Sequence, residues 1–352
     1  MSQSLAVGHA PPRPAAQQRL AGLELRRALQ LVLGVLWLLD GMLQFQPFMF
    51  GRGFPQMLAG GAAGNPAAVA RPITWSATLI SHHEVVLNAV FATIQLLLGL
   101  GIAWRPTVRL ALGVSVAWAL SVWWLGEGLG GLLAGTANPV NGAPGAVILY
   151  ALLAVLLWPA DRDPSAPSVA ARTAGRRVAL GSWLVVWLGL AVLALLPASR
   201  APQAISDTIS DMASSEPVWL AWIDNHLASA LAGHGLPASI VLAALFGAIA
   251  LGILLPAPPR RAVIVLVVAL AAVLWLAQGL GGMLTGSGTD PDSGPLLALL
   301  ALAFWPLAFW PLAGPAASPR SSGSSGSRGS PASPGSSGSP GSPAPAVSPG
   351  EA

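Results

Sequence analysis

Long apolar stretches separated by short polar segments make up most of this chain. Eight of them approach the length that an α-helix needs to cross a bilayer, which is roughly 20 residues for a ~30 Å hydrocarbon core. They are residues 28–48, 85–104, 108–125, 145–158, 178–196, 236–255, 262–280 and 295–312. Because a transmembrane helix satisfies its own backbone hydrogen bonds, the pattern predicts an all-α integral membrane protein with eight transmembrane helices.

The same pattern occurs twice along the chain. The segment WLGEGLGG at residues 124–131 returns as WLAQGLGG at residues 275–282. The offset is close to 151 residues and relates Trp124 to Trp275, His83 to His234, and Pro144 to Pro295. We therefore expect two four-helix repeats. Since four is an even number, both repeats have the same, parallel orientation across the membrane.

The basic residues support this alternation independently. All 17 are arginines, a usage that suggests a GC-rich bacterial genome. With a cytoplasmic N-terminus, only Arg52, Arg71 and Arg200 fall in outer segments, and the other 14 fall inside. The positive-inside rule describes this asymmetry. The sequence therefore predicts a bacterial plasma-membrane protein with both termini in the cytoplasm.

The repeats and the polar segments divide the chain into five parts. We expect a cytoplasmic tail at 1–27, a first repeat at 28–159, a cytoplasmic linker at 160–177, a second repeat at 178–314, and a tail at 315–352. The last part is rich in Ser, Gly and Pro, so it cannot bury a core and is predicted to be disordered. In the outer segments, about 51–81 and 200–235, Trp-bearing stretches predict short interfacial helices.

Composition removes several classes of function. Charged residues are 9% of the chain, against about 25% in soluble domains, so the partner of this surface is the lipid bilayer. The arginines are scattered rather than clustered, so no nucleic-acid partner is expected. The chain has no cysteine. Disulfides, thiolate metal sites and cysteine nucleophiles are therefore excluded.

Asp40 is the first candidate functional residue. It lies about twelve residues into the first apolar run, roughly 18 Å along a helix. A carboxylate at this depth is costly and usually faces a cavity or a partner. Two interpretations stay open: Asp40 belongs to a functional site, or it is neutral and joins two helices by a hydrogen bond. The second repeat has no carboxylate at this place, so either role belongs to one half.

Glu127 is the second candidate, at the outer end of the third apolar run. Its counterpart is Gln278, which keeps the hydrogen-bonding capacity but not the charge. The surrounding glycines superficially match a dinucleotide-binding fingerprint, but that fingerprint needs a preceding strand and a soluble βαβ unit. We expect close helix packing or an unwound helix end instead.

Histidines gather near the predicted outer side. His82, His83 and Glu84 open the second apolar run, and His83 is matched by His234. With Glu127 these imidazoles are candidate ligands of a divalent metal, members of a proton relay, or a bis-His haem pair. The alternative is that they contact headgroups or loop carbonyls, because the segment lacks the spacing of a specific zinc motif.

Two amides follow in the second apolar run. Asn88 and Gln95 lie two turns apart on one helical face. They are candidates for contacts with a substrate. They would equally serve as neutral polar contacts between helices.

One half of the chain resembles a known family. The first apolar run ends in Gly41-x-x-Gln44-Phe45, a long outer segment follows, and the second run contains QLLLGLG at 95–101 before Arg105. These features resemble the DoxX/DoxD-like four-helix membrane proteins, over roughly the first hundred residues after the tail. Some members of that group look like quinone-linked redox subunits. The duplication and the absence of cysteine depart from the usual pattern, and no catalytic residue is carried over.

Three functions are therefore expected from the sequence. The first is a non-enzymatic membrane protein with an outward-facing cavity for a small solute or cation, lined by Asp40, His83 and Glu127. The second is a membrane redox subunit that binds quinone or haem. The third is an assembly factor that acts through helix packing alone.

Overall fold

A computed structural model describes residues 15–309 of the chain, and no strand occurs among them. Five helices are long and apolar enough to cross a membrane. They are α4 (Glu84–Ala103), α5 (Val108–Leu125), α8 (Arg176–Ala194), α12 (Gly235–Gly252) and α13 (Ala257–Ala277). This architecture is that of a helical membrane protein, as the apolar runs predict.

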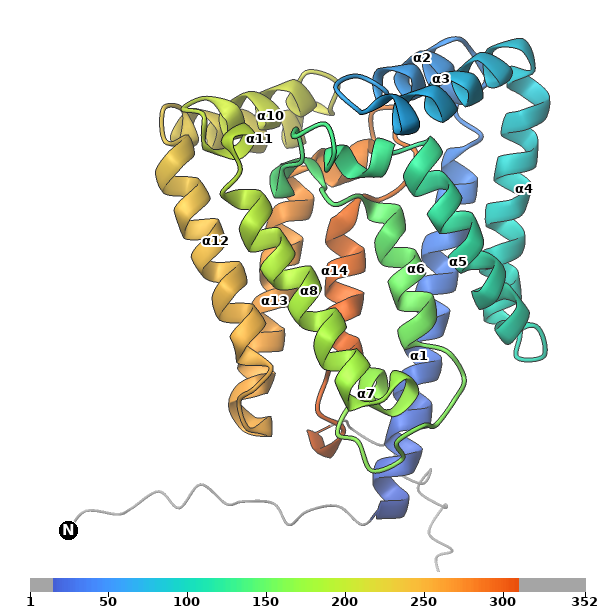
Figure 1. The fold of residues 1–352 in the computed structure, drawn as a ribbon, viewed down its shortest axis with the longest axis vertical. Coiled ribbons are helices and arrows are strands. Elements are labelled where there is room, and N and C mark those ends of the chain that lie inside the picture. The colour runs from blue at the N-terminus through green and yellow to red at the C-terminus, as the bar shows by residue number, and fades with distance from the viewer. Residues whose placement is uncertain (1–14, 310–352) are drawn as a thin grey trace, which may run out of the picture. The chain divides into compact units, whose positions relative to one another are not determined.

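Three further helices run alongside these five (Figure 1). They are α1 (Ala15–Leu43), α6 (Ala146–Leu156) and α14 (Ser293–Ala303). At 11 residues each, α6 and α14 are roughly 16 Å long. Both are apolar on every side, which is typical of a helix enclosed by others. Their contact with each other joins the two halves of one continuous core.

The lengthwise helices are described by half of the chain: α1, α4, α5 and α6 are called the first group, and α8, α12, α13 and α14 the second group. In the first group α1 packs on α4, α4 on α5, and α5 on α6. In the second group α8 packs on α12 and α13 on α14. The inner helix α14 also contacts α1, so the groups share a core rather than a thin boundary.

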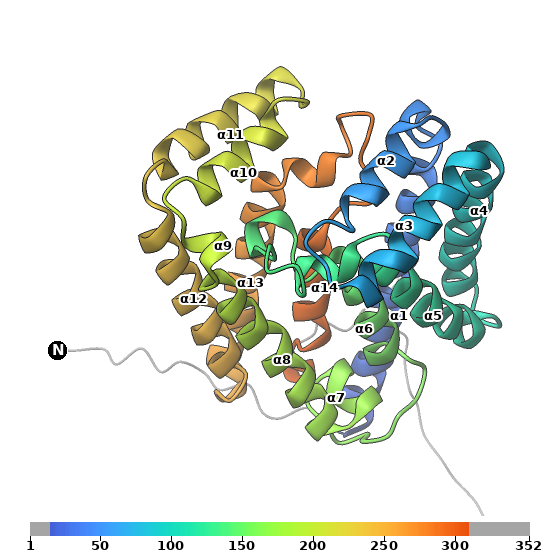
Figure 2. The same ribbon diagram turned by 45° about the horizontal axis from the view of Figure 1, so that its top comes forward.

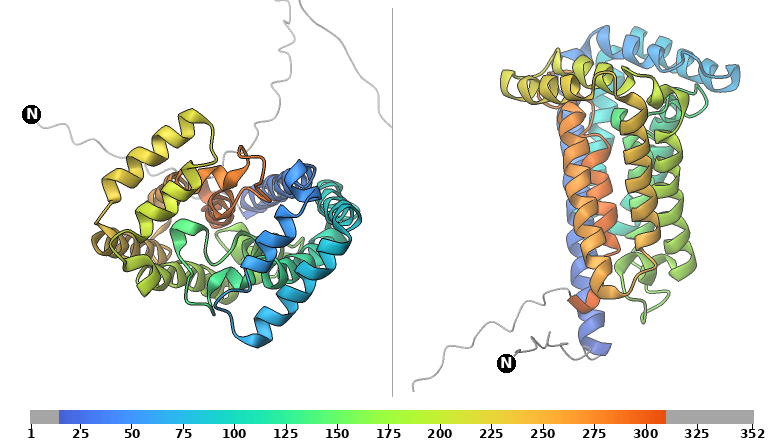
Figure 3. Two further views of the ribbon diagram at one scale, coloured as in Figure 1. Left: turned by 90° about the horizontal axis from the view of Figure 1, so that it is seen from above. Right: turned by 90° about the vertical axis from the view of Figure 1, so that its left-hand side faces the viewer.

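Amphipathic helices cover one end of this bundle. They are α2 (Gly53–Gly60), α3 (Ala67–His82), α10 (Ala204–Ala213) and α11 (Val218–Leu231), and they run across the bundle axis (Figures 2 and 3). Trp75, Trp219 and Trp222 are exposed on them, and indole rings are enriched at membrane–water interfaces. The two segments predicted to hold short Trp-bearing helices therefore do hold helices.

The repeated glycine segments form matching turns at this end. The short helices η2 (Gly128–Gly131) and η4 (Gly279–Gly282) contain left-handed backbone at Leu129 and Leu280, with φ of 58° and 54°. The next residues, Gly130 and Gly281, are also left-handed. A leucine rarely adopts this conformation. The turn must therefore be held by its surroundings.

At Gly130 and Gly281 another backbone segment lies so close to the turn that no side chain would fit. A Cβ on Gly130 would overlap the carbonyl of Pro144, and a Cβ on Gly281 would overlap Pro291. Pro144 is thus matched by Pro291, so its predicted pairing with Pro295 is wrong. The loop between the glycine turn and the next helix is shorter in the second copy. The sequence offset between the copies is therefore 151 residues at the glycine turns but 147 at the starts of α6 and α14.

Each glycine turn is followed by a loop that reaches into the other group of helices. From the loop at 132–145, Pro139 accepts a hydrogen bond from Gln278 Nε2 at 3.3 Å. From the loop at 283–292, the Gly288 carbonyl accepts a hydrogen bond from Gln46 at 3.3 Å. The exchange of loops ties the two groups together at the end that carries the candidate site.

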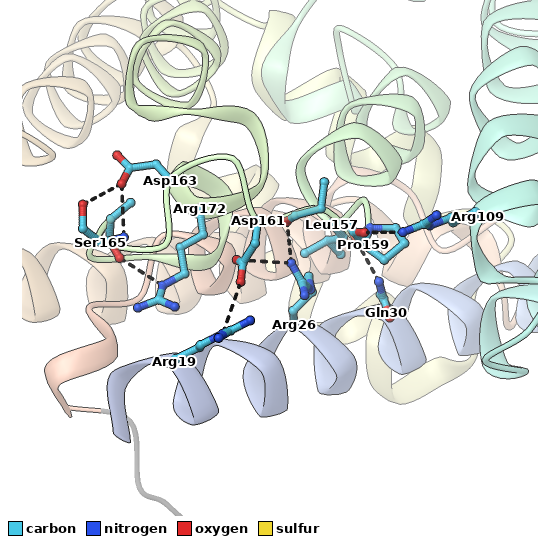
Figure 4. Close-up of polar contacts among 12 residues, drawn as sticks. Arg19, Arg26, Gln30, Arg109, Leu157, Pro159, Asp161, Asp163, Ser165 and Arg172 are labelled. Carbon is cyan, nitrogen blue, oxygen red and sulfur yellow. Dashed lines mark hydrogen bonds and ion pairs between the residues drawn. The ribbon is translucent and has the colours of Figure 1, made fainter. Parts of the chain in front are cut away.

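The opposite end of the bundle is rich in arginine (Figure 4). The last carbonyls of the α6 segment accept hydrogen bonds from side chains: Leu157 from Gln30 at 2.7 Å, Pro159 from Arg109 at 3.4 Å, and Ala160 from Arg26 at 2.6 Å. Cations are favourable at a helix C-terminus, where carbonyls lack intrahelical partners. Arg26 also pairs with Asp161 at 3.8 Å.

These contacts involve two of the predicted segments, the N-terminal tail and the linker. α1 begins at Ala15, well before residue 28, because its arginines bind the bundle end instead of forming a free tail. The predicted linker at 160–177 is folded, since it contains α7 (Val169–Ala174) and buries Arg172, which donates to the Ala166 carbonyl at 3.1 Å. The predicted C-terminal tail at 315–352 lies outside the described residues.

The glycine turns give a stability prediction. Gly130→Ala and Gly281→Ala should each lower the unfolding free energy by about 2–4 kcal/mol, because a new methyl group overlaps backbone and the left-handed φ is strained. Gly181→Ala is the control, since a Cβ there meets open space on α8. Thermal unfolding in detergent measures the effect. Equal stability of the Gly130→Ala and Gly181→Ala proteins would contradict this packing.

Candidate functional site

A cavity of about 190 Å³ lies within the first group of helices. Helices α1, α4 and α5 form its walls, and α2 and α3 cover it at the end opposite the arginines. Its lining is mostly apolar and includes four aromatic side chains, Trp37, Phe54, Phe91 and Trp118. It also includes three carboxylates, Asp40, Glu127 and Asp290. Among residues 15–309, no arginine or histidine lines it.

Asp40 faces this cavity from α1 and is 2% exposed. The hydroxyl of Tyr150 on α6 donates a hydrogen bond to Asp40 Oδ1 at 2.9 Å. The ring of Tyr150 stacks on Trp37 at 4.3 Å between centroids, and the Trp37 indole donates to Ser115 on α5 at 2.9 Å. Three helices therefore fix the position of this carboxyl. Asp40 thus joins two helices by a hydrogen bond and also lines the cavity, so both sequence-based interpretations stay open.

Glu127 lies directly after α5, where the glycine turn begins. Its Oε1 accepts a hydrogen bond from the backbone N–H of Val147 at 3.1 Å, at the start of α6. A helix N-terminus favours a negative charge, so the turn can hold a carboxylate at this place. In the second copy the Gln278 amide Nε2 donates instead to the Ser293 hydroxyl at the start of α14, at 3.1 Å. The other oxygen, Glu127 Oε2, has no hydrogen-bond partner within the described residues.

Asp290 reaches the cavity from the second half of the chain. Its Oδ1 accepts from the N–H of Asp292 at 2.7 Å, and its Oδ2 from Thr289 Oγ1 at 2.9 Å. Burial raises the pKa of Asp290. Burial and then the charge on Asp290 raise the pKa of Asp292 to about 7. No motif or apolar context in the sequence distinguishes these two loop aspartates.

Two amides on the cavity wall lack partners for their oxygens. Gln44 is 4% exposed and Gln95 is 8% exposed, and the Oε1 of each has no hydrogen-bond partner in the described part of the chain. The Trp118 indole N–H is likewise unpaired there. Asn88 lies beside the cavity rather than in it, and its amide donates to the Gln44 carbonyl at 2.7 Å. Gln95 was expected from the sequence, whereas Gln44 entered only through a family resemblance.

A second cavity of about 300 Å³ adjoins the first at the same end. Its lining is polar and includes Asn65, Asn138, Asn141 and Asp292, together with Glu127 and Asp290. The last two residues line both cavities. They therefore stand at the boundary between a polar compartment and a mostly apolar one.

The predicted histidine cluster is not part of this site. His82 and His83 lie at the junction of α3 and α4, and His234 at the junction of α11 and α12. These junctions are at opposite sides of the bundle (Figures 1 and 3). His82 and His234 instead contact nearby backbone carbonyls. Glu84 begins α4.

Metal chelation is not supported by the arrangement of these groups. Among residues 15–309, no three His, Asp or Glu side chains are close enough to hold a metal ion.

In the second half, apolar residues take the places of two polar residues that line the acidic cavity. At the constant offset, Asp40 is replaced by Ala191 and Gln95 by Phe246. Phe246 is fully buried and stacks on Trp187 at 6.0 Å between centroids. The second half therefore packs with apolar side chains where the first half encloses polar ones.

The second half has a different acidic feature. Asp224 on α11 is fully buried, and its carboxyl lies against that of Glu216. Burial and then the charge on Asp224 raise the pKa of Glu216 to about 7, and burial raises the pKa of Asp224. Two carboxyls in contact share a proton when one is neutral. In the first copy Asn65 takes the place of Glu216.

This carboxyl pair predicts a pH-dependent stability. A carboxyl whose pKa is higher in the folded protein than in the unfolded chain loses stability as pH rises through the folded value. The unfolding temperature should therefore fall between pH 5 and pH 8. Glu216→Gln should reduce that fall, since the amide keeps the hydrogen bond without a charge. The exposed Asp211→Asn on α10 is the control. An unchanged slope in Glu216→Gln would exclude the shared proton.

Comparison with protein families, curated proteins and solved structures gives no match. The resemblance to DoxX-like proteins thus stays a prediction.

Proposed function

We propose that this protein is a bacterial plasma-membrane protein whose outward-facing cavity binds, and passes or senses, a small cationic solute. Its eight lengthwise helices would form two four-helix repeats of parallel orientation. The short helices α6 and α14 would cross with the help of the loops that precede them, which line the cavities at the outer end. The arginine-rich end would face the cytoplasm.

The observation that carries this proposal is the charge of the cavity lining. Within the part of the chain that the structure describes, three carboxylates and two unpaired amide oxygens line it, and no basic side chain does. A buried carboxylate without a cation is costly. An arriving cation would offset that cost for every carboxylate that it approaches. Because the cavity is enclosed by apolar helices, the attraction is screened less than at a surface.

A quinone-binding role is the second candidate, and one observation favours it. A groove of about 920 Å³ lies between α5 and α6 on one side and α8 on the other, and its lining is almost wholly apolar. Val155, Val185 and Leu188 are exposed there. Such a groove suits an isoprenoid tail, and quinone that copurifies with the protein would support this role. The bis-His haem variant has less support, because His83 and His234 lie at opposite sides.

The cationic ligand gives a prediction for Asp40. A cation at a concentration of about a hundred times its Kd should stabilise the folded protein by about 2.7 kcal/mol. The measurement is the unfolding temperature of the protein in nanodiscs, in the presence of a panel of inorganic and organic monocations. Asp40→Asn should keep the abundance of the protein, because Tyr150 can still donate to the amide oxygen, but should remove most of the stabilisation. Asp211→Asn is the matched surface control. Lost abundance with retained cation response would instead make Asp40 a structural contact.

The orientation gives a separate prediction. Because the chain has no cysteine, single cysteines report side-chain access directly. Ser165→Cys, in the segment before α7, should be protected from an impermeant maleimide on intact cells. Ser210→Cys on α10 should be labelled. Both positions are exposed, so both should react after permeabilisation. The reverse pattern on intact cells would invert the proposed topology.

A further inference from the structure

The size of the inner cavity limits what it can hold. Its volume is about 190 Å³, and an apolar cavity of about 150 Å³ is known to accommodate a benzene ring. The cavity therefore has room for one ring and a short arm. A larger solute would need α2 or α3 to move.

The walls of this cavity suit a ring. Phe91 on α4 and Trp118 on α5 face each other with their centroids 5.6 Å apart and their planes tilted by 52°. Phe54 on α2 lines the cavity from above and is 6% exposed. Aromatic rings favour tilted or offset contacts with another ring, and they attract a cation placed over a ring face.

The polar groups of the cavity suit an ammonium head. Glu127 Oε2, Gln44 Oε1 and Gln95 Oε1 are buried acceptors without a partner within the described residues. An unpaired buried acceptor costs free energy until a donor arrives. A primary ammonium group brings a positive charge and three donors and has no acceptor of its own. Glu127 supplies a charge for it in addition to a hydrogen bond.

An inorganic cation fits this lining less well. Among the described residues no three acidic or imidazole groups are close enough to replace the hydration shell of a metal. A hydrated ion would have to contact Phe54, Phe91 and Trp118, which cannot solvate it. The adjoining polar cavity can hold water, and it leads to Glu127 and Asp290 at the shared boundary.

From these features we infer that the cavity binds a small organic cation with a primary ammonium head and a ring-sized apolar body. The inference rests on the proposed function, because it names the class of cation that the acidic cavity takes. The solute enters through the polar cavity. Its head meets Glu127 and Asp290 first, and its body then lies against the ring pair Phe91 and Trp118 that lines the cavity.

The test uses the full chain in nanodiscs and four probes. Benzylammonium carries both the charge and the ring, benzyl alcohol the ring alone, methylammonium the charge alone, and K⁺ an inorganic charge. We expect a saturable rise in unfolding temperature that is largest with benzylammonium and absent with K⁺. Isothermal titration of benzylammonium then gives the Kd and the stoichiometry.

Two variants separate the contributions of charge and ring, and the second half of the chain supplies the replacement residue for each. Glu127→Gln introduces the residue found at the matching position 278. It should raise the Kd of benzylammonium on the order of tenfold or more, because a charge-assisted hydrogen bond is lost. The binding of benzyl alcohol should be unchanged. Phe91→Leu copies Leu242 and should weaken both ring-bearing probes equally. Asp211→Asn should change neither. If Glu127→Gln is not recovered folded, Gln95→Leu tests the same acceptor set.

Each outcome is decisive. Stabilisation by K⁺ or methylammonium that equals that of benzylammonium would overturn the organic class and leave a cation-binding cavity. Equal stabilisation by benzyl alcohol and benzylammonium would overturn the ammonium head. If no probe stabilises the protein and Asp40→Asn changes nothing, both this inference and the proposed function fail.

Discussion

The architecture depends on two places where the backbone comes too close for any side chain. At Gly130 and Gly281 a turn closes directly on the loop that precedes the next helix. Because that loop is held there, α6 and α14 begin well inside the bundle and stay short. The start of α6 then presents a free N–H to Glu127. The position of the acidic cavity therefore depends on the absence of a side chain at Gly130 and Gly281.

Acidic groups persist in this apolar bundle because the fold supplies a donor for each. Tyr150 donates to Asp40, the start of α6 to Glu127, and the backbone of Asp292 to Asp290. None of these partners carries a positive charge. Within residues 15–309 the cavity therefore holds three acidic side chains that hydrogen bonds position but no basic side chain neutralises.

The sequence predicted the helices well and the site only in part. Hydrophobic runs report burial in lipid, and the run at 108–125 coincides with α5. The early start of α1 was missed, because Arg26 is polar and is held by a carbonyl 134 residues away. Asp40, Glu127 and Gln95 were identified because charge or amide groups are rare in apolar segments.

Asp290 was missed for a different reason. It reaches the cavity through a loop that belongs to the other half of the chain, and no local pattern records that crossing. The pairing of Pro144 with Pro295 was wrong because a shorter loop changes the offset without changing the motif on either side. Length differences in loops are visible in sequence only when both ends of the loop are recognised.

The crossing of the loops has a consequence for biosynthesis. The walls of the cavity come from α1 to α5, which leave the ribosome early, but Thr289 and Asp290 complete its lining. Until the last helices have inserted, the first group holds an open, incomplete acidic pocket. The complete lining therefore exists only at the end of synthesis, and a chain truncated before residue 289 would carry most of the lining side chains yet lack the finished cavity.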